Sequence, residues 1–382
     1  MDQLTKYDVA IIGGGLAGLS LAIQCAKSGF STALYEKETY PFHKVCGEYI
    51  SLESEDFLAS LGISIRDLQL PIIKNLNVTD VYGNLYNFTL PLGGFGISRF
   101  MLDEMLYNIA LQAGVYVFTN TKVQNIIFNN QQFAISTNQY QHKATIAVGS
   151  FGKRSNLDVK LKRPFINNKK GGLQNFIGIK YHIKYAYPND LITLHNFKNG
   201  YCGISKIEGD KYCLCYLTTA DNLKDNNSSI KQMEASVLYK NPQLKYIFNN
   251  AEFLYKEPLA ISQISFSKKA QVEDHILMIG DSAGLITPLC GNGMSMALHA
   301  SKLAFTEIKA YLQQDISRKD MELNYTNNWK EQFAKRLFMG RLVQRLFGGN
   351  LSTYFFLKLM NSNRWLVNKL IIATHGKPLL NG

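Results

Sequence analysis

The chain has 382 residues, of which 46% are hydrophobic and 18% charged, and its net charge is +12. The length predicts two or three domains, and the composition excludes a disordered chain. An excess of Lys and Arg is typical of proteins that bind an anionic cofactor, an anionic membrane surface or nucleic acid, but it also occurs where surface lysine has no special role.

The cysteines and the N-terminus indicate a reducing compartment. Six cysteines are scattered without a Cys-x-x-Cys pair. This spacing fits neither a disulfide framework nor a zinc site, so we expect no metal. The N-terminus lacks the basic stretch and cleavage site of a signal peptide, and three consecutive glycines argue against a membrane span at 9–26. We therefore expect a cytoplasmic protein.

Residues 8–36 have the pattern of a dinucleotide-binding unit. An apolar strand at 9–12 precedes Gly13-x-Gly15-x-x-Gly18, a helix follows, and the next strand ends at Glu36. The glycines bring backbone N–H groups against a pyrophosphate, and the acid binds a ribose hydroxyl. The dinucleotide-binding residues predicted here are Gly13, Gly15, Leu16, Ala17, Gly18, Glu36 and Lys37.

The next segments do not continue as a simple nicotinamide-binding domain. A loop at 39–54 leads into a helix, and residues 75–90 alternate and turn at Tyr82-Gly83-Asn84, which predicts a β-hairpin. A helix and a strand are expected at 97–119, and an antiparallel meander at 122–149. Interleaved domains of this kind are typical of flavoproteins, so the first loop is expected to bind FAD.

Residues 171–267 are expected to form most of a second domain. Ile177, Ile179, Tyr181 and Ile183 alternate with small or polar residues, which predicts an antiparallel sheet with one covered face. Such a sheet above a flavin makes an apolar pocket for a substrate. Tyr201, Tyr212 and Tyr216 are candidates to line that pocket, with plain core packing as the alternative.

A second glycine-rich loop, "GDSAGLITPLCGNGMSMALHAS", occupies residues 280–301. It has the pattern of a strand end, a loop of small residues and a helix start. A helix N-terminus stabilises an anion, so this loop is a second candidate cofactor contact.

The C-terminal segment 329–380 is basic and helical, with nine Lys or Arg and a single Glu. Basic amphipathic helices contact anionic membrane surfaces or lipid-like molecules. The alternative is a helical lid on the FAD domain with a solvated basic edge. No stretch is long enough to span a bilayer. No nucleic-acid recognition motif accompanies the charge, so we expect no nucleic-acid partner.

Three segments in this order resemble flavoproteins of the para-hydroxybenzoate hydroxylase type, in particular the geranylgeranyl reductase-like branch. They are the first loop with Glu36, "HKVCGE" with "ISRFMLDEML", and the late loop at 280–301. The resemblance covers nearly the whole chain and implies FAD. It implies ribityl contact by Asp281, phosphate contact by Arg99 and adenine contact by Val123. The further cofactor contacts that it implies are Lys44, Cys46, Gly47, Gly149, Gly291, Asn292, Gly293 and Met294.

The chain departs from this family in two places. Gly149-Ser150 stands where an Asp-Gly pair is usual, and Lys153 and Arg154 are the candidates to supply positive charge there. The aromatic and proline motif of geranylgeranyl reductases is missing from the substrate domain. Flavin-dependent halogenases have a Trp-rich motif after the first loop, whereas Trp329 and Trp365 both come late, which argues against a halogenase.

The expected function is that of an FAD-dependent oxidoreductase. The first interpretation is an NAD(P)H-driven monooxygenase that hydroxylates a hydrophobic aromatic, polyketide-like or lipid-like substrate. The alternative is a geranylgeranyl reductase-like enzyme that reduces C=C bonds, and the second alternative is a non-catalytic flavin-binding protein. Cys46 is the candidate catalytic residue, as a proton donor beside the flavin, or a packing residue there. His43 is a weaker candidate for proton transfer.

The predicted fold class is α/β with an α+β second domain. The expected domains are a discontinuous Rossmann-like FAD-binding domain at 1–70, 97–170 and 268–315, an antiparallel substrate domain at 71–96 and 171–267, and C-terminal helices at 316–382. The basic C-terminal helices leave peripheral membrane contact open.

Overall fold

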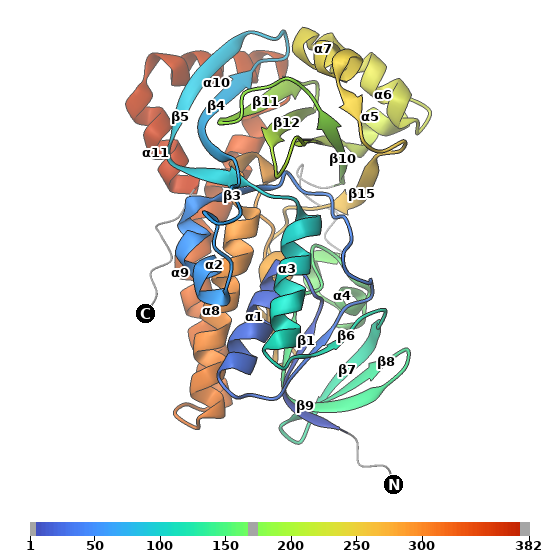
Figure 1. Cartoon of the computed structure of the whole chain (residues 1–382), viewed down its shortest axis with the longest axis vertical. Coiled ribbons are helices and arrows are strands. Elements are labelled where there is room, and N and C mark those ends of the chain that lie inside the picture. Colours follow the sequence, from blue (N-terminus) through green and yellow to red (C-terminus); the bar gives the residue numbers. More distant parts are fainter. Residues whose placement is uncertain (1–4, 167–174, 375–382) are drawn as a thin grey trace.

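The computed structural model describes residues 5–166 and 175–374, so the expected domain boundary at 170–171 lies outside the described residues. Figure 1 shows a lower body of sheet and helices, an upper sheet, and helices along one side. The predicted fold class is confirmed: a Rossmann-like sheet, a second sheet domain and C-terminal helices.

The first sheet is the expected dinucleotide-binding sheet, in the order β16-β17-β9-β1-β2-β6. The strands are β1 (Lys6–Ile12), β2 (Thr32–Tyr35), β6 (Tyr116–Phe118), β9 (Gln141–Gly149), β16 (Val272–Glu273) and β17 (Ile276–Met278). β1 runs parallel to β2 and β9, and β17 runs parallel to β9. β7 (Val123–Asn129) and β8 (Gln132–Thr137) form the antiparallel meander that leads into β9. Strands from both ends of the chain therefore share one sheet.

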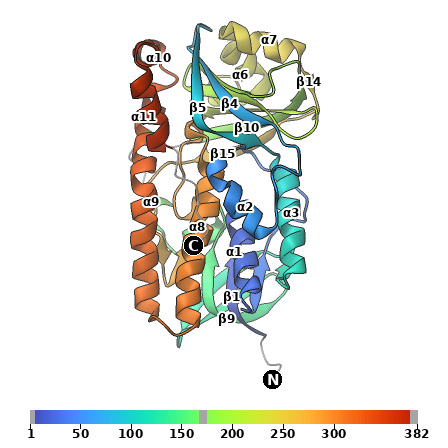
Figure 2. The ribbon, with the colours of Figure 1, turned by 60° about the vertical axis from the view of Figure 1, so that its left-hand side comes forward.

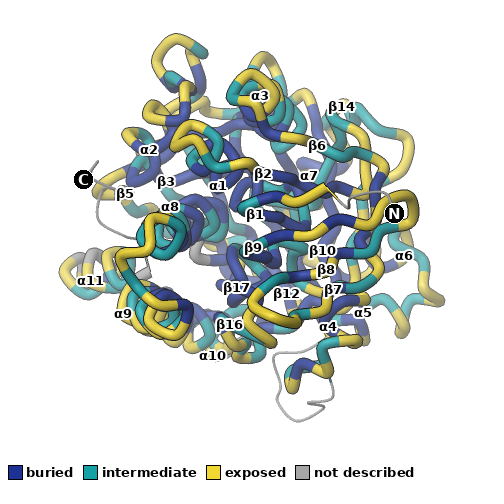
Figure 3. The backbone as a smooth tube through the Cα atoms, turned by 90° about the horizontal axis from the view of Figure 1, so that it is seen from below, coloured by how far each residue is buried: buried dark blue, intermediate teal, exposed yellow. Residues whose placement is uncertain are grey.

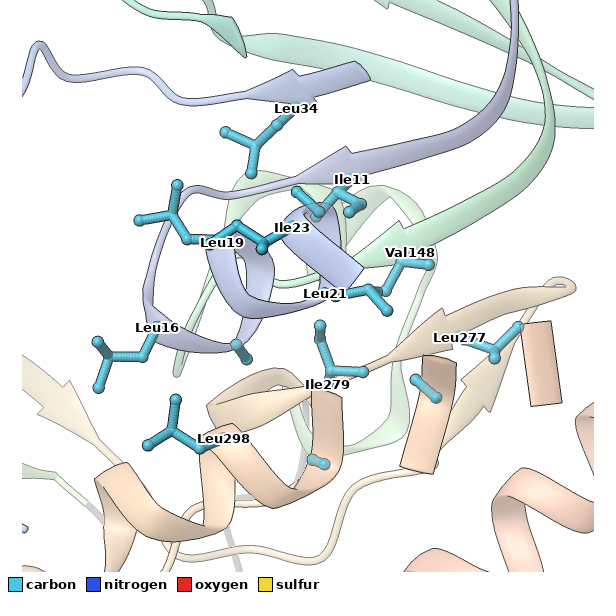
Figure 4. Close-up of a cluster of buried hydrophobic side chains, with 14 of the residues drawn as sticks. Ile11, Leu16, Leu19, Leu21, Ile23, Leu34, Val148, Leu277, Ile279 and Leu298 are labelled. Carbon is cyan, nitrogen blue, oxygen red and sulfur yellow. The ribbon is translucent and has the colours of Figure 1, made fainter. Parts of the chain in front are cut away.

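Helix α1 (Leu16–Lys27) joins these distant segments into one core. Its side chains are apolar on nearly every side, which is typical of a helix buried all round. Figure 4 shows Leu19, Leu21 and Ile23 of α1 among side chains of β1, β9, β17 and α8 (Gly293–Leu312). The side chains of Leu19, Leu21 and Ile23 are fully buried. Helices α2 (Glu55–Leu61), α3 (Arg99–Gln112) and α4 (Asn156–Lys160) complete this body.

The second sheet has the order β14-β10-β13-β12-β11-β4-β5-β3, with β15 beside β10. The strands are β3 (Tyr49–Ser51), β4 (Ile72–Thr79), β5 (Leu85–Gly96), β10 (Phe176–Lys184), β11 (Leu191–Phe197), β12 (Gly200–Lys206), β13 (Tyr212–Thr219), β14 (Glu252–Phe253) and β15 (Leu259–Ile264). Pairing is antiparallel except between β11 and β4. β3 comes from the range expected in the FAD domain and ties that segment to the second sheet.

The two faces of the second sheet have different surroundings. The outer face is covered by α5 (Ala220–Lys224), α6 (Ile230–Ser236) and α7 (Pro242–Asn250). Ile179, Tyr181 and Tyr216 pack there with Leu244 of α7. Because successive side chains of a strand point to opposite faces, Lys180 and His182 of β10 point to the inner face, toward the FAD-type domain.

The C-terminal helices are α9 (Arg318–Leu346), α10 (Asn350–Ser362) and α11 (Arg364–Thr374). Trp329 and Phe333 of α9 are buried in the core of the first domain. Figure 2 shows α9 beside α8, with α10 and α11 continuing along the second sheet. In Figure 3 the strands β1, β9 and β17 lie buried at the centre, and α9 keeps an exposed outer side. Among the described residues, every helix is too short or too polar to cross a membrane.

Candidate flavin site

The two glycine-rich loops contact each other. Gly280 of the late loop has φ +57°, and a Cβ added there would lie 3.2 Å from Cβ of Ala17 and 3.7 Å from Cβ of Ala297. Ala17 belongs to the first turn of α1, and Ala297 to the second turn of α8. The starts of both helices, and both glycine loops, therefore belong to one site.

The first loop uses its glycines in two ways. A Cβ on Gly13 would lie 2.2 Å from the carbonyl oxygen of Ser150, and a Cβ on Gly18 would lie 2.0 Å from that of Gly13. At both positions any other residue would clash with a neighbouring backbone carbonyl, so glycine is required there. A Cβ on Gly15 would instead meet only Nζ of Lys44 at 3.6 Å and Nη2 of Arg99 at 3.7 Å. Open space therefore remains between the α1 N-terminus and two cations.

Asp103 of α3 holds those two cations in position. Arg99 donates from Nε and Nη2 to the two carboxylate oxygens of Asp103, at 2.7 Å each. Nζ of Lys44 lies 3.3 Å from the same carboxylate. Burial acts to lower the pKa of the Arg99 guanidinium, but the charge of Asp103 outweighs it and raises this pKa. Two fixed cations at the positive end of a helix form a binding site for a pyrophosphate.

Glu36 lies at the other end of this loop, where the chain leading to Val123 contacts it. The Glu36 carboxylate accepts from the N–H groups of Gly14, at 2.9 Å, and Glu38, at 3.1 Å. The N–H of Thr121 donates to the carbonyl oxygen of Glu36 at 2.8 Å, just before β7 begins at Val123. Glu36 is buried, whereas Lys37 is exposed and forms an ion pair with Glu38 at 3.4 Å. The cofactor contact of Lys37 stays a prediction.

The late loop presents Asp281 and the start of α8. Burial raises the pKa of the Asp281 carboxyl although Lys269, Arg99, Lys153 and Lys44 act to lower it. Asn292 is the N-cap residue of α8, which begins at Gly293. The cations around Asp281 include the two above Gly15, so Asp281 is close to the pyrophosphate position.

Gly291 brings the late loop against the second sheet. It has φ +62°, and a Cβ there would lie 3.1 Å from the ring of Tyr49. The buried hydroxyl of Tyr49 has no hydrogen-bond partner among the residues that the structure describes. Met294, in the first turn of α8, is buried. The cradle at Gly15, the paired cations and this buried hydroxyl fit a long anionic dinucleotide such as FAD.

The loop after β9 serves packing more than binding. A Cβ on Gly149 would lie 2.6 Å from Sδ of Met278, and the N–H of Ser150 donates to Ile12 at 2.8 Å. Of the two candidate cations, Arg154 is exposed. Burial lowers the pKa of Lys153 to about 8, against the charge of Asp281. Lys153 is therefore the cation of this loop that is close to the site.

Glu48 lies at the junction of the two domains, and sequence reasoning missed it. One carboxylate oxygen accepts from the N–H of Arg99 at 2.8 Å and from Nζ of Lys180. The other lies 2.6 Å from Nε2 of His182. Burial acts to raise the pKa of Glu48, but the His182 hydrogen bond and the Lys180 charge outweigh it, so this pKa lies below its ordinary value. Glu48 is therefore an ionised, fully buried carboxylate.

A chain of hydrogen bonds runs from Glu48 to a partly exposed histidine. Nδ1 of His182 lies 2.6 Å from the hydroxyl of Tyr255, and that hydroxyl lies 3.2 Å from Nδ1 of His43. The ring of His43 stacks on Phe100 with centroids 4.6 Å apart. We call Glu48, His182, Tyr255 and His43 the relay. Each link is within hydrogen-bond distance, so protons can move along it.

Cys46 lies beside the buried end of the relay. Its thiol accepts a hydrogen bond from the N–H of Glu48, and its carbonyl oxygen accepts from Sγ of Cys213 at 3.3 Å. Burial raises the pKa of the Cys46 thiol, so it is protonated at neutral pH. A protonated thiol can give up a proton but is a poor nucleophile. Gly47, next in the chain, is exposed, and a Cβ there would meet nothing within 4 Å.

The same cluster brings together three atoms that a metal ion could bind. Ligand atoms of Glu48, His182 and Cys213 lie within 4.8 Å of one another. The ammonium group of Lys180, hydrogen-bonded to Glu48, already supplies the positive charge that a cation would bring. The arrangement therefore fits proton transfer better than metal binding.

The predicted substrate tyrosines do not share one face. Tyr216 donates to Glu234 of α6 at 2.7 Å, and Tyr212 donates to the carbonyl oxygen of Tyr187. Both lie in the outer cluster, so their assignment to a pocket on the flavin side is wrong: strand parity turns them away from it. Tyr201 faces inward and packs with Leu289 of the late loop.

Comparison with known proteins agrees with this fold. Residues 7–162 match the pyridine nucleotide-disulphide oxidoreductase family. Conditioned medium factor receptor 1 of Dictyostelium discoideum is 25% identical over 88% of this chain and 70% of that protein. The solved flavin-dependent brominase Bmp2 has a TM-score of 0.75 and 21% identity, covering 96% of this chain and 93% of that one. A geranylgeranyl bacteriochlorophyll reductase-like protein from Thermoplasma acidophilum has a TM-score of 0.73 and 18% identity, covering 98% and 93%.

The fold and the site thus define an FAD-dependent oxidoreductase. In fold and sequence the chain is similar to flavoproteins of the para-hydroxybenzoate hydroxylase and geranylgeranyl reductase-like types. Its likeness to the brominase is one of fold. Trp329 and Trp365 lie in α9 and α11, so the Trp-rich motif expected of a halogenase after the first loop is missing.

Proposed function

We propose that this protein reduces C=C double bonds of a hydrophobic, isoprenoid-type substrate. The observation that carries the proposal is the relay, which ends beside the protonated thiol of Cys46. Reduction of a double bond needs a hydride, which reduced FAD supplies when bound, and a proton, which the protein must supply. Cys46 is the donor of that proton.

The relay restores the proton that Cys46 gives up. The partly exposed His43 takes a proton from solvent, and the hydroxyl of Tyr255 passes it to His182. Lys180 keeps Glu48 ionised, and the Glu48 carboxylate orients the His182 ring. The protonated His182 then gives its proton to the Cys46 thiolate and becomes neutral again, while the Glu48 N–H holds the sulfur in position and the Glu48 carboxylate stays ionised. A positioned acid of this kind contributes about 10²–10⁴-fold to a rate.

Hydroxylation of a phenolic substrate is the second candidate. A phenolic substrate has to lose its hydroxyl proton before it is hydroxylated. The relay could carry that proton in the opposite direction, from its buried end to solvent. The protonated thiol of Cys46 beside the relay favours reduction, because oxygen transfer from a flavin to a phenol needs no acid at that position.

NAD(P)H is the electron donor in this proposal. Lys153, a half-buried cation next to the place of the usual Asp-Gly motif, is a candidate for its phosphate contacts. Stopped-flow mixing of the oxidised protein with NADH and NADPH would measure flavin bleaching directly. No bleaching with either one would remove NAD(P)H from the proposal.

Oxygen separates the two reactions. Pre-reduced protein would be mixed anaerobically with a lipid carrying a geranylgeranyl chain, and product followed by mass spectrometry. We expect a product heavier by two hydrogens without O₂. Strict dependence on O₂, with stoichiometric oxygen uptake on a phenolic probe and no anaerobic product, would overturn the reductase in favour of the hydroxylase.

A further inference from the structure

The C-terminal helices carry exposed apolar stripes that the flavin site does not use. They consist of Phe338 and Leu342 in α9, Phe355 and Leu359 in α10, and Trp365 and Ile372 in α11, which are 44% to 64% exposed. Spacings of four and seven residues put each pair on one side of its helix. We call these six residues the C-terminal face. Exposure of large apolar groups at this density marks an interaction surface.

Positive charge surrounds this face. Residues 332–382 include eight Lys or Arg and no Asp or Glu. Lys335, Arg345, Lys358 and Lys369 are exposed. Nζ of Lys369 lies 3.8 Å from the ring centroid of Trp365, so a cation and an exposed indole lie together. An apolar face edged by cations is typical of helices that lie in the headgroup region of an anionic bilayer.

The inner side of the same helices closes the space between the two domains. Val343 of α9 and Leu370 of α11 pack against a cluster that contains Leu289 of the late loop and Leu217 of the inner sheet face. The link between α9 and α10 is fixed to the second sheet, because the N–H of Asn199 donates to Gly348 at 2.9 Å. Figure 2 shows the three helices along one side of the molecule. One thin apolar wall therefore separates the C-terminal face from the flavin side of the sheet.

We propose that the C-terminal face docks on the surface of an anionic lipid bilayer. The apolar side chains enter the headgroup boundary and the lysines and arginine contact lipid phosphates. A second copy of the chain is a poor occupant, because a two-fold interface through this face would bring the same cations together without an acid. Docking places the apolar wall at the lipid surface, whichever reaction the flavin performs.

Vesicle flotation of the full-length, FAD-loaded protein tests the proposal. Vesicles of phosphatidylcholine alone and of phosphatidylcholine with phosphatidylserine are compared at low and high salt. We expect flotation with the anionic vesicles, weakened by salt. Lys358→Glu with Lys369→Glu should weaken binding by roughly fivefold or more for each charge changed. Phe355→Ser with Trp365→Ser should abolish flotation at both salt concentrations.

A matched control uses α7, which also exposes an aromatic ring and a lysine. Tyr246→Ser with Lys245→Glu should float like wild type, since α7 covers the outer face of the second sheet. Absorbance of bound FAD checks that every variant is folded. Absence of flotation in wild type, or equal flotation of the Phe355→Ser/Trp365→Ser variant, overturns the proposal. So does a stable dimer in solution that the same variant dissociates. These results do not depend on turnover, so a failed reductase assay leaves them unaffected.

Discussion

Oε2 of Glu48 and Nε2 of His182 are 2.6 Å apart, although the two residues are separated by 134 positions in the chain. Glu48 ends the loop that follows the first Rossmann unit, and His182 lies near the end of β10. Together with Lys180 they make a charged contact that is fully inside the protein. This contact thus joins the two domains and is also part of the proposed relay.

Glu48→Gln should destabilise the protein by about 3–5 kcal/mol at pH 7, because it leaves the buried ammonium of Lys180 without its counter-charge. The pKa of Glu48 in the folded protein lies below its ordinary value of 4.5. Its contribution is therefore fully present above pH 4.5 and is lost as the pH falls through the lower, folded value. Urea unfolding over a series of pH values measures the difference from wild type. Glu257→Gln, an exposed control, should change little. A Glu48→Gln deficit that stays constant down to pH 3 would contradict this.

Gly15→Val should give a folded protein that does not retain FAD. The Cβ of the added side chain has only the ends of Lys44 and Arg99 within 4 Å, so we expect the valine to fill the space for the pyrophosphate without a backbone clash. Far-UV circular dichroism and the flavin absorbance of the purified protein measure the two properties separately. A yellow Gly15→Val protein would refute the assignment of the pyrophosphate position.

Glu36→Ala should weaken FAD by roughly 1.5–3 kcal/mol, the usual contribution of a hydrogen bond to a charged group. Lys37→Ala, its neighbour, should bind FAD like wild type, because the Lys37 side chain is exposed and forms an ion pair with Glu38. Titration of the apoprotein with FAD, followed by flavin fluorescence, gives both affinities. Equal losses in the two variants would show that the carboxylate does not bind the ribose.

Tyr255→Phe should interrupt the relay without altering the binding of FAD. It removes the hydroxyl that links His182 to His43, so we expect product formation to fall by about 10²-fold and the solvent isotope effect to change. Tyr212→Phe is the matched control, since Tyr212 lies on the outer face. If the two variants have the same rate and isotope effect, protons do not travel along the relay.

Cys46→Ser tests the donor itself. A serine hydroxyl is a far weaker acid than a thiol, so anaerobic product formation should slow by about 10²–10⁴-fold while flavin reduction proceeds normally. Single-turnover kinetics with pre-reduced protein separate these steps. Turnover within a few-fold of wild type would mean that Cys46 only packs in the loop, as the alternative interpretation holds.

The dinucleotide-binding unit was predictable because its evidence is local. The strand, the three glycines, the helix and Glu36 lie within thirty residues, and each has a direct physical reason. The late loop was also found from its own pattern. Its contact with Ala17 was not predicted, and the structure supplies that contact through Gly280.

The relay could not be predicted in the same way, because its residues come together only through tertiary structure. Lys180 and His182 stood out as the polar half of an alternating strand, but alternation alone does not say which face is solvated. Here helices cover the apolar face and the FAD domain covers the polar one. For the same reason, the alternation of side chains along β13 puts Tyr212 and Tyr216 on the outer face of the sheet and not in the expected pocket.

The pairing of β17 with β9, and of β9 with β1, has a consequence for how the protein is made. Strand β17 emerges from the ribosome long after β1, with the whole second sheet synthesised in between. Contacts of such wide sequence separation form slowly and leave apolar strand surface exposed in the meantime. One side of helix α1, which is buried all round in the complete protein, is covered only after α8 has been synthesised. We therefore expect FAD binding, which uses both glycine loops in our assignment, to be a late event that follows the synthesis of residue 293.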